Sequence, residues 1–134
     1  SPEVIPVIFI CSLYDCYIIV HKFYHKKSLM MNRSIQTGRD NQILRTASVL
    51  VDIGTQKKAQ ILARELVEWV KSNDTAVGLA APQTGVNLRV IACALGTETP
   101  DGYEIRRVVG MINPCIVEAS NEMCREEEAC FSVP

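Results

Sequence analysis

Residues 56–73 read QKKAQILARELVEWVKSN, and this stretch decides the fold. Its apolar side chains recur three and four positions apart, which is the spacing of one helical face. Thr55 precedes the stretch as a candidate N-cap. The sequence therefore predicts an amphipathic helix whose apolar face packs on a core, and that face comprises Ala59, Leu62, Ala63, Leu66, Trp69 and Val70.

Short apolar segments separated by turn-forming residues follow the helix. A small-residue loop, AVGLAAPQTGVN, comes first, and it is followed by three predicted strands and an extended end, at 88–95, 103–113, 115–119 and 123–133. We expect Ser120 and Asn121 to turn the chain. One long helix followed by strands in series predicts an α+β fold, with an antiparallel β-sheet packed on the helix.

The composition changes near residue 40. Residues 4–20, VIPVIFICSLYDCYIIV, are nearly all apolar, yet a membrane-spanning helix needs about 20 such residues. A membrane anchor, a buried strand or helix and a non-native leader all stay open for this segment. Residues 21–39 contain no acid, which suits a transit peptide or a solvated linker. We expect residues 1–39 to be a leader or linker dispensable for folding, and residues 40–134 to form the domain.

Charge and cysteine content exclude two classes of protein. With 14 basic and 15 acidic residues, the net charge of −1 argues against direct nucleic-acid binding driven by phosphate contacts. Six cysteines in 134 residues, without a C-x₂-C pair, do not predict a disulfide scaffold or a zinc ribbon. His21 and His25 are four residues apart but lack the pattern of a zinc helix, so they are read as surface residues. A small metal module using Cys115, Cys124 and Cys130 remains an alternative.

Two stretches could carry chemistry. In residues 77–83, Gly78 and its small neighbours would let a substrate backbone approach closely, and Gln83 offers an amide donor. In EEEACFS, residues 126–132, three carboxylates disfavour a thiolate at Cys130 unless a cation lies nearby, and a bound metal would deprotonate the thiol. Each stretch also fits a plain structural role: a tight helix-to-strand connection, and a solvated acidic run beside an ordinary cysteine.

Together these stretches resemble a known family. AVGLAAPQTGV resembles the first signature of peptide deformylases, G-x-G-[LI]-A-A-x-Q, and EEACFSVP resembles their second, E-G-C-L-S. Their order and the intervening Asn113-Pro114 also match, and the similarity runs from about Gln42 to Pro134. The resemblance implies a deformylase-like α+β domain and a metal-dependent hydrolase. Such an enzyme removes the formyl group from the N-terminal formyl-methionine of newly made proteins.

The resemblance also implies roles for individual residues. It assigns one divalent metal, natively Fe²⁺, with Zn²⁺, Ni²⁺ or Co²⁺ as alternatives. The metal ligand would be Cys130, the oxyanion donors would be the Gln83 amide and the Phe131 backbone N–H, and the substrate-binding residues would be Val77, Gly78 and Glu128.

The chain also departs from the family pattern. Ala76 and Ala129 stand where glycine is usual, and Phe131 stands where leucine is usual, which would reshape the methionine pocket. The family completes its metal site with a later H-E-x-x-H helix, which this sequence stops short of. We therefore expect the 134 residues alone to be inactive. The alternative is a degenerate, non-catalytic deformylase-like binding domain, membrane-tethered through residues 4–20.

Partners and location follow from the same resemblance. The expected partner is an N-formylmethionyl peptide or nascent chain, with the ribosome as a further candidate. Membrane contact through residues 4–20 stays open. The expected location is the cytoplasm in a bacterium, and the mitochondrion or plastid in a eukaryote.

Overall fold

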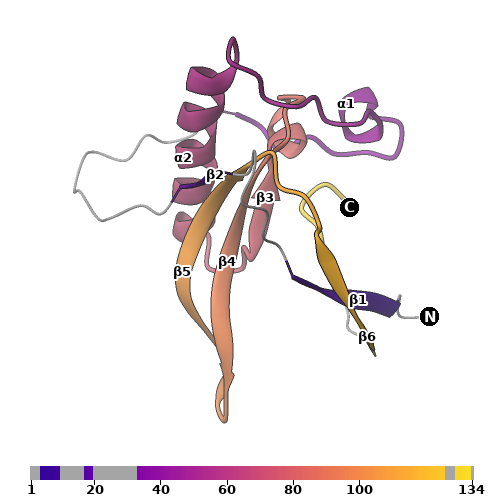
Figure 1. Cartoon of the computed structure of the whole chain (residues 1–134), viewed down its shortest axis with the longest axis vertical. Helices are drawn as coiled ribbons and strands as arrows, with labels where there is room; N and C mark the ends of the chain where they lie inside the picture. The colour runs from indigo at the N-terminus through magenta and orange to yellow at the C-terminus, as the bar shows by residue number, and fades with distance from the viewer. Residues whose placement is uncertain (1–3, 10–16, 20–32, 126–128, 134) are drawn as a thin grey trace.

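The computed structural model describes residues 4–9, 17–19, 33–125 and 129–133. A four-stranded sheet lies against one long helix, and a separate two-stranded ribbon lies to one side (Figure 1). The elements are β1 (Val4–Phe9), β2 (Tyr17–Ile19), α1 (Gln42–Arg45), α2 (Gln56–Ser72), β3 (Gly78–Ala80), the 3₁₀ turn η1 (Ala81–Thr84), β4 (Val90–Thr99), β5 (Gly102–Ile112) and β6 (Glu118–Arg125).

The sheets are antiparallel, as the sequence predicts. The larger sheet has the order β2-β5-β4-β3, and the ribbon pairs β1 with β6. Each of these strand pairs is antiparallel; β4 and β5 form the central hairpin, with Val90 opposite Ile112. The predicted α+β class, an antiparallel sheet packed on a long helix, is confirmed.

Helix α2 packs its predicted apolar face against β4 and β5. The buried side chains of this face are Ala59, Leu62, Ala63, Leu66, Val67 and Val70. Burying one leucine side chain contributes about 1.5–3 kcal/mol, so this face supplies much of the stability of the core. One member of the predicted face differs: Trp69 is only partly buried and packs at the edge of the core, while Val67 is buried.

The N-terminus of α2 is held by a local turn. Thr55 occupies the N-cap position, as predicted, but its side chain makes no capping bond to the helix. Its hydroxyl instead donates to Asp52 Oδ1 at 2.7 Å, and its backbone N–H donates to the same oxygen at 2.9 Å. These hydrogen bonds from Thr55 lower the pKa of the Asp52 carboxyl, because they favour its ionised form.

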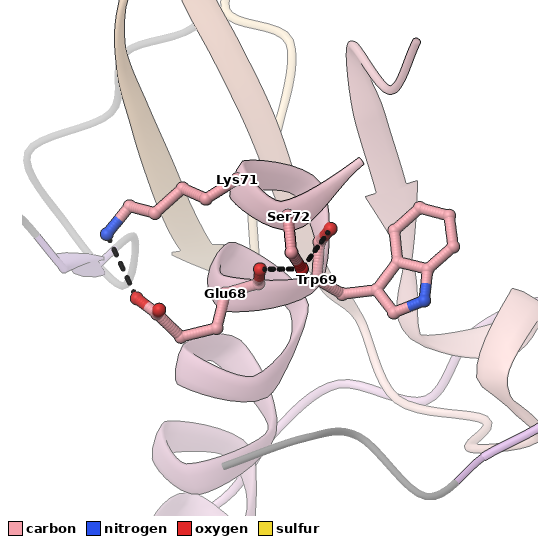
Figure 2. Close-up of polar contacts among 4 residues, drawn as sticks. All are labelled: Glu68, Trp69, Lys71 and Ser72. Atoms are coloured by element: carbon pink, nitrogen blue, oxygen red, sulfur yellow. Dashed lines mark hydrogen bonds and ion pairs between the residues drawn. The ribbon is translucent and has the colours of Figure 1, made fainter. Parts of the chain in front are cut away.

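The C-terminal turn of α2 is closed by polar side chains. The Ser72 hydroxyl donates to the backbone oxygen of Glu68 at 2.7 Å and to that of Trp69 at 3.1 Å. Lys71 Nζ lies 3.0 Å from Glu68 Oε1 (Figure 2). The Trp69 ring points to the other side of the helix from this ion pair, which leaves the ring available to a neighbouring segment.

The predicted strands between the helix and Asn113 agree with the observed ones, whereas the predictions for the residues after Asn113 agree less well. Within the predicted loop 76–87, the structure forms the short strand β3 and the turn η1. The predicted strand at 115–119 is wrong in extent, since β6 starts only at Glu118. The predicted turn at Ser120 and Asn121 is also wrong, because both lie inside β6, at the point where the register of its pairing with β1 shifts.

The side chain of Asn113, at the end of β5, forms two hydrogen bonds with the backbone of Val51, in the segment before α2. Asn113 has a positive φ of 53°, which a short polar side chain tolerates better than most. Its Oδ1 accepts from the Val51 N–H at 2.8 Å, and its Nδ2 donates to the Val51 oxygen at 2.9 Å. The side chain thus pairs with Val51 much as a neighbouring strand would.

Parts of residues 1–39 also lie in strands. Strand β2 pairs with the end of β5, where Tyr17 lies opposite Ile112, and β1 pairs with β6. In the part of the chain that the structure describes, no helix has the length and apolar character needed to cross a membrane. His21 and His25 lie outside the described residues.

We predict that Gly110→Ala lowers the free energy of unfolding by about 1–3 kcal/mol. A Cβ at Gly110 would lie 3.3 Å from Ala63 Cβ, Ala63 O and Val67 Cγ2, so α2 and β5 would have to move apart. The measurement is urea denaturation followed by circular dichroism.

The matched control is Gly54→Ala, whose new Cβ would meet only Asp52 Oδ1, at an ordinary 3.5 Å. This variant should unfold close to the wild-type midpoint. A Gly110→Ala protein at least as stable as Gly54→Ala would contradict the close helix–strand approach.

Candidate active site

The two signature segments meet at the side chain of Gln83. Its Nε2 lies 3.5 Å from Cys130 Sγ and donates to Ser132 Oγ at 3.2 Å. Its Oε1 accepts from the Ala80 backbone N–H at 2.8 Å. The structure therefore brings together two predicted site residues, Gln83 and Cys130, that are 47 positions apart in the chain.

The local sequence explains why Gln83 points this way. Pro82 lies in the first turn of η1, where its fixed φ suits a helical start and its missing N–H is not needed. Gly85 ends the turn with φ 82°, and its N–H bonds back to Ala81 and Pro82. Gln83 comes three residues after Ala80 in the chain, and the tight turn between them brings its side-chain oxygen within hydrogen-bond distance of the Ala80 backbone N–H.

A third segment ties the two signatures together through its backbone. We call residues 36–38 the strap. The Gln36 backbone N–H donates to the backbone oxygen of Gln83 at 2.7 Å. The Gly38 backbone N–H donates to the backbone oxygen of Ser132 at 3.4 Å. Gly38 has φ +106°, a conformation that side chains rarely adopt. The strap therefore fixes the spacing of the two signature segments.

Phe131 is anchored on α2 by an aromatic contact. Its ring and that of Trp69 have centroids 5.2 Å apart and planes at 86°, an edge-to-face pair. Such a pair contributes about 0.5–1.5 kcal/mol beyond the buried area. Trp69 is therefore not simply the core residue that its helical spacing indicates: it also positions the segment that carries Cys130.

Val77 and Gly78 lie where the chain enters β3, the last strand in the described order of the larger sheet. The Val77 oxygen accepts from the Ala94 N–H at 2.8 Å, while its side chain is 67% exposed. A Cβ at Gly78 would lie 3.2 Å from the Ala92 oxygen, so glycine permits a close approach to β4. A strand at the end of a sheet can receive an extended peptide.

The described residues do not form a metal site by themselves. No group of three or more His, Cys, Asp or Glu side chains among them is placed to hold a metal ion. Cys130 is exposed, and its thiol fits the role of one sulfur ligand. The side chain of Cys124 and the whole of Glu128 lie outside the described part of the chain.

A groove of about 390 Å³ lies elsewhere, along the N-terminal half of α2. Its lining includes Arg33, Lys57, Lys58 and Glu65, with the Arg33 Nε 3.7 Å from the Glu65 carboxylate. Its lining reaches the first signature segment only at Val86 and includes neither Gln83 nor Cys130. The polar contacts around Gln83, and not this groove, define the candidate site.

Sequence reasoning missed Ser132 and the strap. Ser132 belongs to the second signature, and this membership was the one sign in the sequence that it could be part of the site. Its hydroxyl contacts Gln83, which is 49 positions away in the chain, and local patterns do not show such a contact. Gln36 and Gly38 lie in the basic stretch read as linker, and only the folded backbone reveals their hydrogen bonds.

An antiparallel α+β domain with an amide and a thiol side by side is the arrangement that the resemblance to peptide deformylases implies. The family model for polypeptide deformylase matches residues 33–134. The chain belongs to the peptide deformylase family.

Individual relatives agree with this assignment. The chain is 33% identical over 94 residues to peptide deformylase 2 of Gloeobacter violaceus, covering 70% of this chain and 47% of that protein. It is 39% identical over 92 residues to the peptide deformylase of Dictyoglomus thermophilum, covering 69% and 52%. The chain therefore spans about half the length of these curated relatives.

Solved structures show the same fold. The crystal structure of a class I type b peptide deformylase from Acinetobacter baumannii, with Met-Ala-Ser bound, matches with a TM-score of 0.65 and 31% identity. The match covers 80% of this chain and 68% of that one.

We predict that iodoacetamide at pH 8 alkylates Cys115 and Cys130 before Cys93. Cys115 and Cys130 are exposed, whereas burial raises the pKa of the Cys93 thiol and leaves less of the reactive thiolate. Raising the pH should accelerate the alkylation of Cys93, because a larger fraction of its thiol is then ionised.

Peptide mass spectrometry over time measures the three rates separately. Reaction of Cys93 in urea, where the thiol is exposed, is the control for its intrinsic reactivity. Native Cys93 reacting as fast as native Cys115 would contradict the partial burial of the Cys93 thiol in β4.

Proposed function

We propose that the protein is a peptide deformylase that hydrolyses the formyl group from the N-terminal formyl-methionine of newly synthesised proteins. The contact between the Gln83 amide and the Cys130 thiol carries the proposal, because it unites a donor and a soft ligand from two signatures. Membership of the family and the likeness to a deformylase with Met-Ala-Ser bound support the same substrate class.

In this proposal the chain stabilises the tetrahedral intermediate with two donors. The Gln83 Nε2 and the Phe131 backbone N–H face the oxygen of the formyl carbon as it gains negative charge. Preorganised donors of this kind are worth about 10²–10³ in rate each, because they need no reorganisation during the reaction. The Trp69 contact on Phe131 and the Ala80 contact on Gln83 supply that preorganisation.

The substrate peptide is proposed to run along the exposed end of the sheet at Val77 and Gly78. Glu128, which lies outside the described residues, is proposed to complete the substrate side of the site. Backbone pairing along β3 would hold the peptide, and the Phe131 ring, 42% exposed, would shape the pocket for the methionine side chain.

Cys130 is proposed as the sulfur ligand of one divalent metal, natively Fe²⁺, with Zn²⁺, Ni²⁺ or Co²⁺ as substitutes. A bound divalent cation lowers the pKa of a water ligand toward neutrality and polarises the carbonyl oxygen. Among the described residues, no group of three or more His, Cys, Asp or Glu side chains is placed to hold the metal. We therefore propose that residues 1–134 alone do not turn over substrate. Formate release by the protein encoded by the complete gene separates an enzyme from a non-catalytic binding domain, membrane-tethered or not.

The setting of the reaction is proposed from the relatives. Several are bacterial deformylases, which supports the cytoplasm as the location and the nascent chain, near the ribosome, as the substrate. For a eukaryotic source the proposed location is the mitochondrion or plastid. We also propose that residues 1–39 are a leader or linker and that residues 40–134 form the deformylase-like domain.

We predict that Cys130→Ala and Gln83→Leu fail differently in the protein encoded by the complete gene, reconstituted with Ni²⁺ or Fe²⁺. Cys130→Ala should lose both bound metal and activity, because it removes a ligand. Gln83→Leu should keep its metal while kcat falls about 10²–10³-fold, because it removes only a donor.

Formate release from formyl-Met-Ala-Ser and metal content by atomic absorption are the two measurements. Cys93→Ala is the matched cysteine control, and it should keep both metal and kcat. A Cys130→Ala protein that binds metal and turns over normally would overturn the proposal.

A further inference from the structure

We propose that Ser132 is a positioning residue for Gln83: its hydroxyl takes one amide hydrogen of Gln83 and thereby directs the other toward the Cys130 side. This inference deepens the proposed function and rests on it for the catalytic consequence. The hydrogen bond itself is Gln83 Nε2 to Ser132 Oγ, 3.2 Å.

The orientation of the Gln83 amide follows from chemistry. A glutamine side chain offers an acceptor oxygen and a nitrogen with two donor hydrogens, and the two ends can be exchanged by a flip. The Ala80 backbone N–H can only donate, so the atom 2.8 Å from it must be the Gln83 oxygen. The nitrogen and its hydrogens must therefore face Cys130 and Ser132.

Ser132 is placed to act as a fixed acceptor. It is only 8% exposed, and together with Thr84 it makes up the buried polar residues of the described core. The Thr84 hydroxyl bonds within its own turn, to the Ala81 oxygen at 2.8 Å, whereas the Ser132 hydroxyl reaches a distant segment. The Ser132 backbone oxygen is meanwhile bonded by the strap at Gly38.

The position of Ser132 in the chain extends its effect. It directly follows Phe131, whose N–H is the second proposed donor, and Cys130 comes just before. The Val133 N–H bonds to the Cys130 oxygen at 3.0 Å, which closes this turn. Anchoring Ser132 at its hydroxyl and its carbonyl therefore fixes both proposed oxyanion donors relative to one another.

The direct test is the side-chain amide signal of Gln83 in ¹⁵N-labelled protein. The two proton resonances are assigned by their loss in Gln83→Leu. In Ser132→Ala we expect one of the two to move upfield and to exchange faster with water, and in Ser132→Thr we expect it to return. Ser120→Ala, a serine of β6 whose hydroxyl bonds to Glu122, is the matched control and should change neither resonance.

Gln83 resonances that stay unchanged in Ser132→Ala would overturn the proposal. So would a Ser132→Thr spectrum that matches that of Ser132→Ala.

The kinetic test uses formate release by the metal-loaded protein encoded by the complete gene. Loss of one neutral hydrogen bond should lower kcat about two- to tenfold, with KM little changed and Ser132→Thr near wild type. A general structural defect would instead reduce the folded fraction, and the remaining enzyme would keep its kcat.

The two tests separate the failures. Wild-type protein that releases no formate would contradict the proposed function. The Gln83 amide resonances would still test whether the Ser132 hydroxyl binds the Gln83 amide. Formate release with unchanged kcat in Ser132→Ala would overturn the positioning role alone.

Discussion

The amide of Gln83 has its oxygen bound by the Ala80 N–H and its nitrogen facing Cys130 and Ser132, and the arrangement of the site depends on this constraint. A side chain can bridge two segments accurately only if both are rigid. The first is rigid because η1 is a tight turn on the end of β3. The second is held by the Gly38 hydrogen bond to the Ser132 backbone oxygen and by the contact of the Trp69 and Phe131 rings.

The rigid base comes from the packing of α2 on the sheet. Gly110 lets β5 approach Ala63 and Val67 closely, and the buried face of α2 fills the space over β4. The C-terminal end of this helix presents Trp69 toward the second signature. A helix whose main role is to cover the core thus also sets the position of Phe131 and, through the chain, of Cys130.

Local patterns made much of this predictable. Helical spacing predicted α2, and short apolar runs between turn residues predicted β4 and β5. The two signatures pointed to Gln83 and Cys130, which the structure brings into contact. The features that the sequence did not predict depend on pairing between segments that are far apart in the chain. Ser120 and Asn121 lie inside β6 because the residues on both sides of them pair with the distant β1. The strap is defined by backbone hydrogen bonds, which the residue composition does not reveal. The domain boundary at residue 40 stays a prediction. Gln36 and Gly38, which bond to the two signature segments, lie on the N-terminal side of this boundary.

The most direct measurement of the central claim, that Gln83 and Cys130 act as one site, is a double-mutant cycle on the free energy of unfolding. Gln83→Leu, Cys130→Ala and the double variant are unfolded in urea alongside the wild-type protein. The Gln83–Cys130 contact predicts a coupling of about 0.5–1.5 kcal/mol between the two side chains. Effects that add to within about 0.3 kcal/mol would contradict the account.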